Sequence, residues 1–149
     1  MNNWYGIILT SAFTIIGGVI VFCFSQLALK LFIEPIQELG KCRGEICDTL
    51  LFKRNLYLNP GTLSEEKILV LSNEIRRLGT KLLSIKNILR CNKFFSKLNL
   101  STKGENILEA HKGLIGLSNA IGRNLSQDEI KIISSYEDDI KKALNIRFE

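Results

Sequence analysis

The stretch WYGIILTSAFTIIGGVIVFCFSQLAL, residues 4–29, contains 26 residues and no charged side chain. As a helix it would be about 39 Å long, at about 1.5 Å per residue, whereas the hydrocarbon core of a bilayer is about 30 Å thick. Its many Ile, Leu, Val and Phe side chains outweigh the mildly polar Thr, Ser and Gln side chains in the free energy of membrane insertion. The sequence therefore predicts one transmembrane helix near the N-terminus.

A cleavable signal peptide is the alternative interpretation of this stretch. The apolar run is longer than the roughly 7 to 15 residues of a signal peptide, no Lys or Arg precedes it, and the residues before Ala28 do not match a cleavage site. We therefore expect an uncleaved anchor in the inner membrane. Because basic residues begin only at Lys30, the N-terminus should lie outside and the rest of the chain in the cytoplasm.

Small side chains share one face of the predicted span, and such a face lets two membrane helices approach closely. They are Ser11, Thr14, Gly18 and Ser25. This pattern predicts a homo-oligomer that forms within the bilayer. The alternative is that these residue types are common in any transmembrane helix, since the span holds no Gly-x-x-x-Gly.

The remaining residues, 30–149, hold all 20 basic and all 15 acidic side chains, so the net charge of +5 belongs to this part. Its length suits one domain with a real core. Pro35 should end or kink the membrane helix near residues 32–34 and open a second helix that runs toward Tyr57. Apolar residues keep helical spacing along that second helix, at Ile36, Leu39, Ile46 and Leu50.

The most regular pattern of the chain predicts a central core helix with Leu78 buried midway along it. Its apolar positions, spaced three and four residues apart, are Ile68, Leu71, Ile75, Leu78, Leu82, Ile85 and Leu89. A coiled-coil seam is the alternative, but four further apolar residues widen the stripe and favour an intramolecular bundle. These are Leu69, Val70, Leu83 and Ile88.

Three capping-box patterns, at residues 62–65, 102–105 and 126–129, predict where helices begin. A short helix is expected at residues 94–98, a longer one up to Gly122, and a last one whose apolar stripe is interrupted by Glu137. No segment alternates like a half-buried strand. We therefore expect an all-α protein, with an anchor over residues 1–33 and a cytoplasmic bundle of four to five helices over residues 34–149.

A basic stretch, residues 67–103, contains nine Lys and Arg residues and one acidic residue, Glu74. A surface of this kind attracts phosphate, in lipid headgroups, RNA or a nucleotide. The alternative is an ordinary solvated face of a cytoplasmic domain. The candidate anion-binding residues are Arg76, Arg77, Lys81, Lys86, Arg90, Lys93 and Lys97.

The cysteines do not predict a metal site or a set of disulfides. Cys42, Cys47, Cys91 and His111 would have to combine one Cys-x4-Cys pair with two distant ligands, so buried thiols are expected instead. The sequence contains no further pattern of metal ligands, and we expect neither a metal nor a cofactor.

Residues 105–111, ENILEAH, resemble the Arg-polar-x4-His motif of HEPN ribonucleases, which are small helical bundles. The resemblance implies Asn106 and His111 as candidate catalytic residues. Glu105, however, occupies the place of the arginine, whose positive charge would stabilise a phosphate transition state. We therefore expect no ribonuclease activity, no catalytic residue and a helix-face histidine packed beside Leu114.

Two longer stretches, FIEPIQE at 32–38 with GEI at 44–46 and NILEA at 106–110 with LIGLSN at 114–119, resemble a widespread family of small bacterial proteins. That family has one N-terminal span and an all-helical cytoplasmic domain, and the resemblance implies this architecture but no activity. In layout the chain is also similar to membrane-anchored effectors of anti-phage systems, some of which carry degenerate HEPN-like bundles and form pores.

Two functions are consistent with these observations. The first is a non-enzymatic, homo-oligomeric interaction protein that is anchored in the lipid bilayer and contacts headgroups or a partner through its basic face. The second is a HEPN-like effector that responds to RNA or a nucleotide, with pore formation and anti-phage defence as its implied role.

Overall fold

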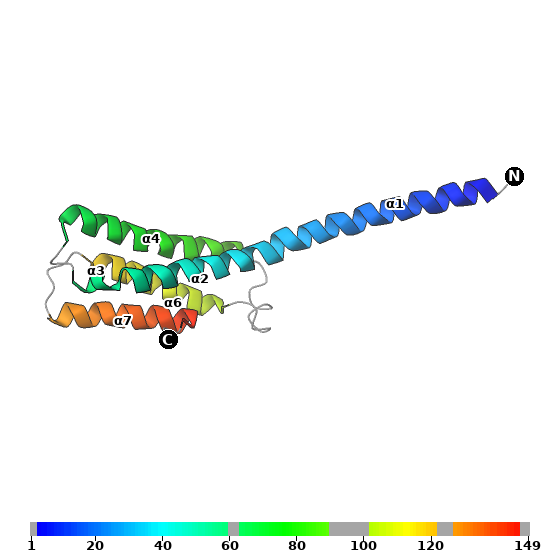
Figure 1. Cartoon of the computed structure of the whole chain (residues 1–149). Coiled ribbons are helices and arrows are strands. Elements are labelled where there is room, and N and C mark those ends of the chain that lie inside the picture. Colours follow the sequence, from blue (N-terminus) through cyan, green and yellow to red (C-terminus); the bar gives the residue numbers. More distant parts are fainter. Residues whose placement is uncertain (1–2, 60–62, 90–101, 122–126, 147–149) are drawn as a thin grey trace.

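A computed structural model describes residues 3–59, 63–89, 102–121 and 127–146, and within these ranges the chain is helical, with no β-strand (Figure 1). The all-α prediction is confirmed. The elements are α1 (Asn3–Ala28), the π-helix η1 (Leu29–Ile33), α2 (Glu34–Phe52), α3 (Arg54–Leu58), α4 (Glu65–Ile88), α6 (Gly104–Ala120) and α7 (Gln127–Leu144).

The apolar helix α1 projects away from the bundle and continues through η1 into α2 without a break (Figure 1). Over Trp4–Phe52 this is the one helix of the described residues that is long and apolar enough to cross a membrane, and no part of its apolar window is buried. Of the two outcomes expected near residues 32–34, an end or a kink, the structure excludes the end. The geometry of the helix changes there, but the chain stays helical.

Pro35 gives the physical reason for the π-helix. It has no N–H to donate, and its ring would collide with the carbonyl of Leu31 in a regular α-helix. The preceding turn widens instead, so that the Glu34 N–H bonds the Leu29 carbonyl five residues back. The helix thereby passes a proline without ending.

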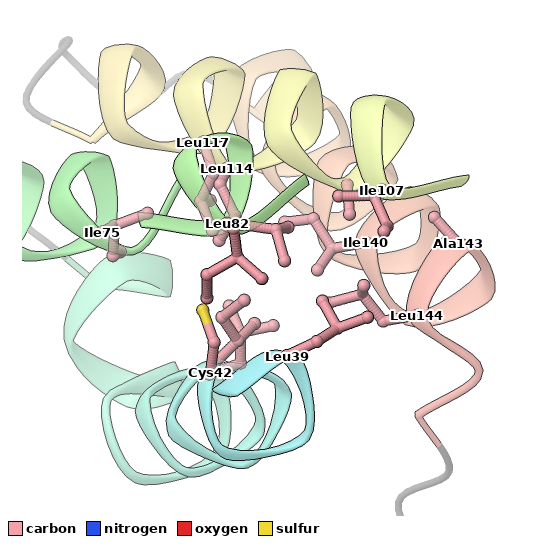
Figure 2. Packing of buried hydrophobic residues seen from close by; sticks show 14 of the residues in the cluster. Leu39, Cys42, Ile75, Leu82, Ile107, Leu114, Leu117, Ile140, Ala143 and Leu144 are labelled. Carbon is pink, nitrogen blue, oxygen red and sulfur yellow. The ribbon is translucent and has the colours of Figure 1, made fainter. Parts of the chain in front are cut away.

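The bundle consists of α2, α4, α6 and α7, which run in alternating directions beside one another (Figure 1). Apolar side chains from all four helices meet along its axis, and Leu82, Leu114, Ile140 and Leu144 are fully buried (Figure 2). The apolar face of α4 thus packs within its own chain. The intramolecular bundle that its wide stripe favoured is what forms.

Five of the seven predicted stripe positions of α4 are buried, but Ile68 and Leu78 lie at the edge of the buried face. Leu78 is only half-buried, whereas its neighbour Gly79 is buried against α6. Leu69, Val70 and Ile88 do not widen the core, because their side chains are exposed. The spacing of three and four residues runs through Leu78, so it does not predict burial of Gly79, which lies about 100° further around the helix.

Helices α4 and α6 start two residues and one residue later than their capping boxes predict, whereas α7 starts where its box predicts. Helix α4 begins at Glu65 with Ser64 at the N-cap position, and α6 begins at Gly104 with Lys103 there; neither side chain caps its helix. Helix α7 begins at Gln127. The positions that lie outside the described residues are Thr62, Gly122, Ser126 and residues 94–98.

Candidate functional site

The predicted basic surface separates into side chains on different edges of α4. The Arg76 guanidinium donates to the Asn119 side-chain oxygen of α6 at 2.5 Å. The Lys81 ammonium, about 140° further around α4, donates to both carboxylate oxygens of Glu45 in α2, at 2.6 and 2.8 Å. These two cations join α4 to its neighbours in the bundle, and they do not share one surface.

The ion pair with Glu45 also raises the pKa of Lys81, because the carboxylate stabilises the ammonium form. Both side chains are close to half exposed, so solvent screens the pair. Arg77 is exposed and Lys86 is half-buried, whereas the remaining three candidates, Arg90, Lys93 and Lys97, lie outside the described residues. For Arg77 and Lys86, anion binding stays a prediction.

His111 has a structural contact. Its Nδ1 lies 2.9 Å from the Gly79 carbonyl oxygen, and because a carbonyl only accepts, this nitrogen carries the proton. Asn106 is five residues away on α6, which places it about 140° around the helix from His111. The two residues of the HEPN-like motif therefore do not converge on one surface, and His111 joins α6 to α4.

The cysteine and histidine positions form no group that could hold a metal among the residues that the structure describes. Cys42 is buried in the core of the bundle, and Cys47 is half-buried on the same helix. Cys91 lies outside the described ranges.

The small-residue face of α1 is exposed along its whole length. Thr14 donates to the Thr10 carbonyl at 2.9 Å and Ser25 to the Val21 carbonyl at 2.8 Å, so these hydroxyls bond their own helix. A Cβ placed on Gly18 would meet nothing within 4 Å. Gly18 is therefore the point at which another helix could approach α1 most closely.

A pair of exposed glycines that was not predicted as an interaction site lies on α2. Gly40 and Gly44 form a Gly-x-x-x-Gly, and a Cβ on either would meet nothing within 4 Å. Gly44 is two residues from both Cys42 and Ile46, which are fully buried, so it points away from the core. Each glycine lowers helix stability by about 1 kcal/mol relative to alanine, and among the described residues no contact requires either one.

Glu137 is the acidic residue that interrupted the predicted stripe of α7, and its side chain is 1% exposed. The Arg54 Nε lies 3.3 Å from its Oε1, and the Lys141 Nζ lies 2.5 Å from the same atom. Oε1 accepts no hydrogen bond of good geometry, so its charge is balanced by ion pairs. This cluster ties α3 to α7.

Tyr57 lies beside this cluster, fully buried, and donates its hydroxyl proton to the Leu50 carbonyl at 3.0 Å. Burial and the adjacent Glu137 carboxylate both disfavour the phenolate, so the pKa of Tyr57 lies well above its ordinary value. The predicted helix toward Tyr57 is in fact two helices, since α2 ends at Phe52 and α3 carries Tyr57 back against the core.

An apolar groove lies between α3 and α4, at the end of the bundle farthest from α1 (Figure 1). Its volume is about 380 Å³, and Leu56, Leu63, Val70 and Leu71 form its apolar lining. Charged side chains of both signs complete it, namely Lys53, Glu66, Lys67 and Glu74. Lys53 pairs with Glu74 across the two elements.

Phe52 ends α2 immediately before Lys53, and its side chain is 81% exposed. A phenylalanine this exposed, next in the chain to a residue that lines an apolar groove, is unlike the scattered single apolar residues of an ordinary surface. In the sequence Phe52 belongs to an apolar run, Leu-Leu-Phe at residues 50–52. Such a run predicts buried core residues equally well, so it did not reveal the exposure of Phe52.

Comparisons with protein-family models, with curated proteins and with solved structures find no match to this chain.

Proposed function

We propose that this chain is a non-enzymatic, single-pass membrane protein that assembles with copies of itself and holds a helical interaction domain in the cytoplasm. The observation that carries the proposal is the helix Trp4–Phe52, whose apolar half is uncovered by the bundle and whose other half is a bundle helix. A lipid bilayer is the medium that can cover so many exposed apolar side chains, and α2 then couples the bundle rigidly to the span.

The distribution of basic residues supports the orientation. None precedes the apolar stretch, and Lys30, Lys41 and Arg43 follow it closely. Cytoplasmic segments next to a span carry such an excess of Lys and Arg. The N-terminus would then lie outside the inner membrane.

Exposed glycines on both halves of the long helix support self-assembly. Gly18 lies within the apolar half, and Gly40 and Gly44 lie on the solvent side of α2. Copies in one membrane share their orientation, so equal positions of two parallel helices can meet. Glycine makes a helix less stable than alanine does, and close packing of two helix backbones at these glycines would offset that loss.

Contact with anionic headgroups is the further part of this proposal. Lys30 follows the apolar stretch directly, and Lys86 lies in the last turn of α4, which ends beside the start of α2 (Figure 1). Cations at this level would lie within reach of the inner leaflet, where each contributes about 1 kcal/mol to binding an acidic surface.

Self-assembly is tested in the full chain with Gly18→Leu and Gly17→Leu, reconstituted in bilayers and crosslinked. Both positions are open, but they point about 100° apart around α1. We expect a ladder of oligomers from the wild type and Gly17→Leu and its loss from Gly18→Leu, with insertion unchanged because Leu is more apolar than Gly. A wild-type chain that stays monomeric in membranes would overturn the proposal.

An RNA pull-down by the same full-length chain tests the effector alternative. In the structure the Nδ1 of His111 is hydrogen-bonded to the Gly79 carbonyl oxygen. This nitrogen is therefore engaged within the bundle and gives the effector alternative no support. Salt-sensitive capture of RNA, lost in His111→Ala, would favour the effector. Liposome binding without RNA capture would favour the interaction protein.

A further inference from the structure

Phe52 directly precedes Lys53, which lines the groove between α3 and α4, so an exposed aromatic residue and an apolar groove adjoin in the chain. Val70 lines the groove and is 61% exposed, and Leu56 beside it is also exposed. A phenyl ring is smaller than the 380 Å³ of the groove. Phe52 does not occupy its own groove, because 81% of its side chain faces solvent.

The bilayer is too far away to cover this surface. Helix α2 has 19 residues and follows the π-helix at the end of the apolar stretch, so Phe52 lies about 28 Å further along the helix axis than the start of α2. Because η1 keeps the chain helical, α2 carries the bundle away from the bilayer even with the usual tilt of a span. The occupant of the groove is therefore a protein surface.

Two features of the surface favour a second copy of this chain as the occupant of the groove. Copies in one membrane are related by an axis along the membrane normal, which brings together points at equal distance from the bilayer. Phe52 and the groove lie at the same end of the bundle and satisfy this condition (Figure 1). The rim of the groove also carries two bases and two acids, so two such rims do not repel each other although the whole chain has a net charge of +5.

We infer that Phe52 of one copy inserts into the α3–α4 groove of a second copy and that the second copy reciprocates. The inference rests on the proposed membrane anchoring, which supplies the parallel arrangement. Two copies would then touch at two places: at Gly18 within the bilayer, and at Phe52 and the groove at the end of the bundle farthest from α1. Aromatic side chains in desolvated pockets dominate the energetics of interfaces of this kind.

Val70 and Leu69 provide a matched pair of variants for the first test. Both side chains are 61% exposed on α4, but Val70 lines the groove and Leu69, one position along, does not. Full-length Val70→Glu and Leu69→Glu are compared with the wild type by energy transfer between labelled copies in liposomes. We expect dimerisation to fall about tenfold or more in Val70→Glu and to stay within about twofold in Leu69→Glu, because only the first places a charge where the ring of Phe52 is buried.

Measured as monomers in detergent, the melting temperatures of both variants should equal that of the wild type, since neither residue is in the core. Equal dimerisation in Val70→Glu and Leu69→Glu would overturn the inference. If Gly18→Leu abolishes assembly while Val70→Glu has no effect, the proposed function stands and this contact alone is refuted. A wild type that is monomeric in liposomes refutes both.

A photoreactive side chain at position 52 identifies the surface that Phe52 contacts. Phe52→p-benzoyl-phenylalanine in the full chain, irradiated in liposomes that contain an unlabelled and a ¹⁵N-labelled copy, should give mixed-label dimers. The adduct should map to the groove, at Leu56, Leu63 or Val70 of the other copy. Adducts to lipid, to the same copy, or to other positions of the second copy would overturn the inference.

Discussion

Gly79 of α4 lies directly against Leu114 of α6, and a Cβ built on Gly79 would come within 3.2 Å of the Leu114 Cβ. The hydrogen side chain allows the two helices to approach closely at this point. The contact also sets the rotation of α4, because it places Gly79 in the interface and moves Leu78 to its edge. The carbonyl of Gly79 then accepts the bond from His111.

This rotation predicts different losses for two leucines of the same stripe. Leu82 is fully buried and Leu78 half-buried. Leu82→Ala should lower the free energy of unfolding by about 2 to 5 kcal/mol, and Leu78→Ala by about 1 kcal/mol, because less apolar surface and a smaller cavity are involved. Denaturant unfolding of the full chain in detergent measures both. A larger loss from Leu78→Ala would mean that α4 is rotated the other way.

Two glycine-to-alanine changes should act in opposite directions. A Cβ on Gly116 would lie 2.5 Å from the Tyr136 ring, so Gly116→Ala should push α7 from α6 and lower the unfolding free energy by about 1 to 3 kcal/mol. Gly44→Ala meets open space in the monomer and should raise it by about 1 kcal/mol through helix propensity. Thermal unfolding of monomeric chain in detergent compares them, and a gain in both would contradict the packing of α6 on α7.

Glu137→Gln tests the buried ion cluster. The substitution keeps the shape of the side chain but leaves Lys141, which is largely buried, without its closest counter-charge. We expect a loss of about 2 kcal/mol in unfolding free energy, below the range for a fully buried pair because Arg54 can turn to water. Asp138→Asn is the control, since this exposed carboxylate lies 3.7 Å from Lys141 and should change stability by less than about 0.5 kcal/mol.

Tyr57 predicts loss of stability at alkaline pH. In the unfolded chain its pKa is about 10, and burial beside Glu137 raises the pKa in the folded chain. The contribution is fully present below pH about 10 and is lost as the pH rises toward the folded pKa, because the unfolded chain releases the proton first. Lys81 acts in the same direction, so the measurement needs a variant that isolates Tyr57.

Tyr57→Phe is that variant. It should lose about 1 kcal/mol at neutral pH, where the hydrogen bond to the Leu50 carbonyl is missing. Its unfolding free energy should then fall less steeply than that of the wild type between pH 9 and pH 11, a window around the ordinary tyrosine pKa of about 10. Equal slopes in the two proteins would show that Tyr57 is accessible to solvent.

The sequence by itself determined the apolar span, the all-helical class and the positions of the main helices. Each depends on local chemistry, namely an uncharged run long enough for a bilayer and an apolar period of three and four residues. Pro35 was correctly placed as the point where helix geometry changes: local rules predicted an end or a kink, and the chain formed a π-helix.

Only the tertiary structure decided how deeply each residue of a helix face is buried and which charges are paired. Lys81 and Glu45 are 36 residues apart in the sequence, and Arg54 and Glu137 are 83 residues apart. The apolar period along a helix cannot predict ion pairs between residues so far apart. The exposure of Phe52 has the same origin, because the chain leaves α2 at that residue and α3 turns Tyr57 inward instead. These features depend on the close packing of whole helices, where a single glycine such as Gly79 sets the rotation, and local sequence patterns do not carry that information.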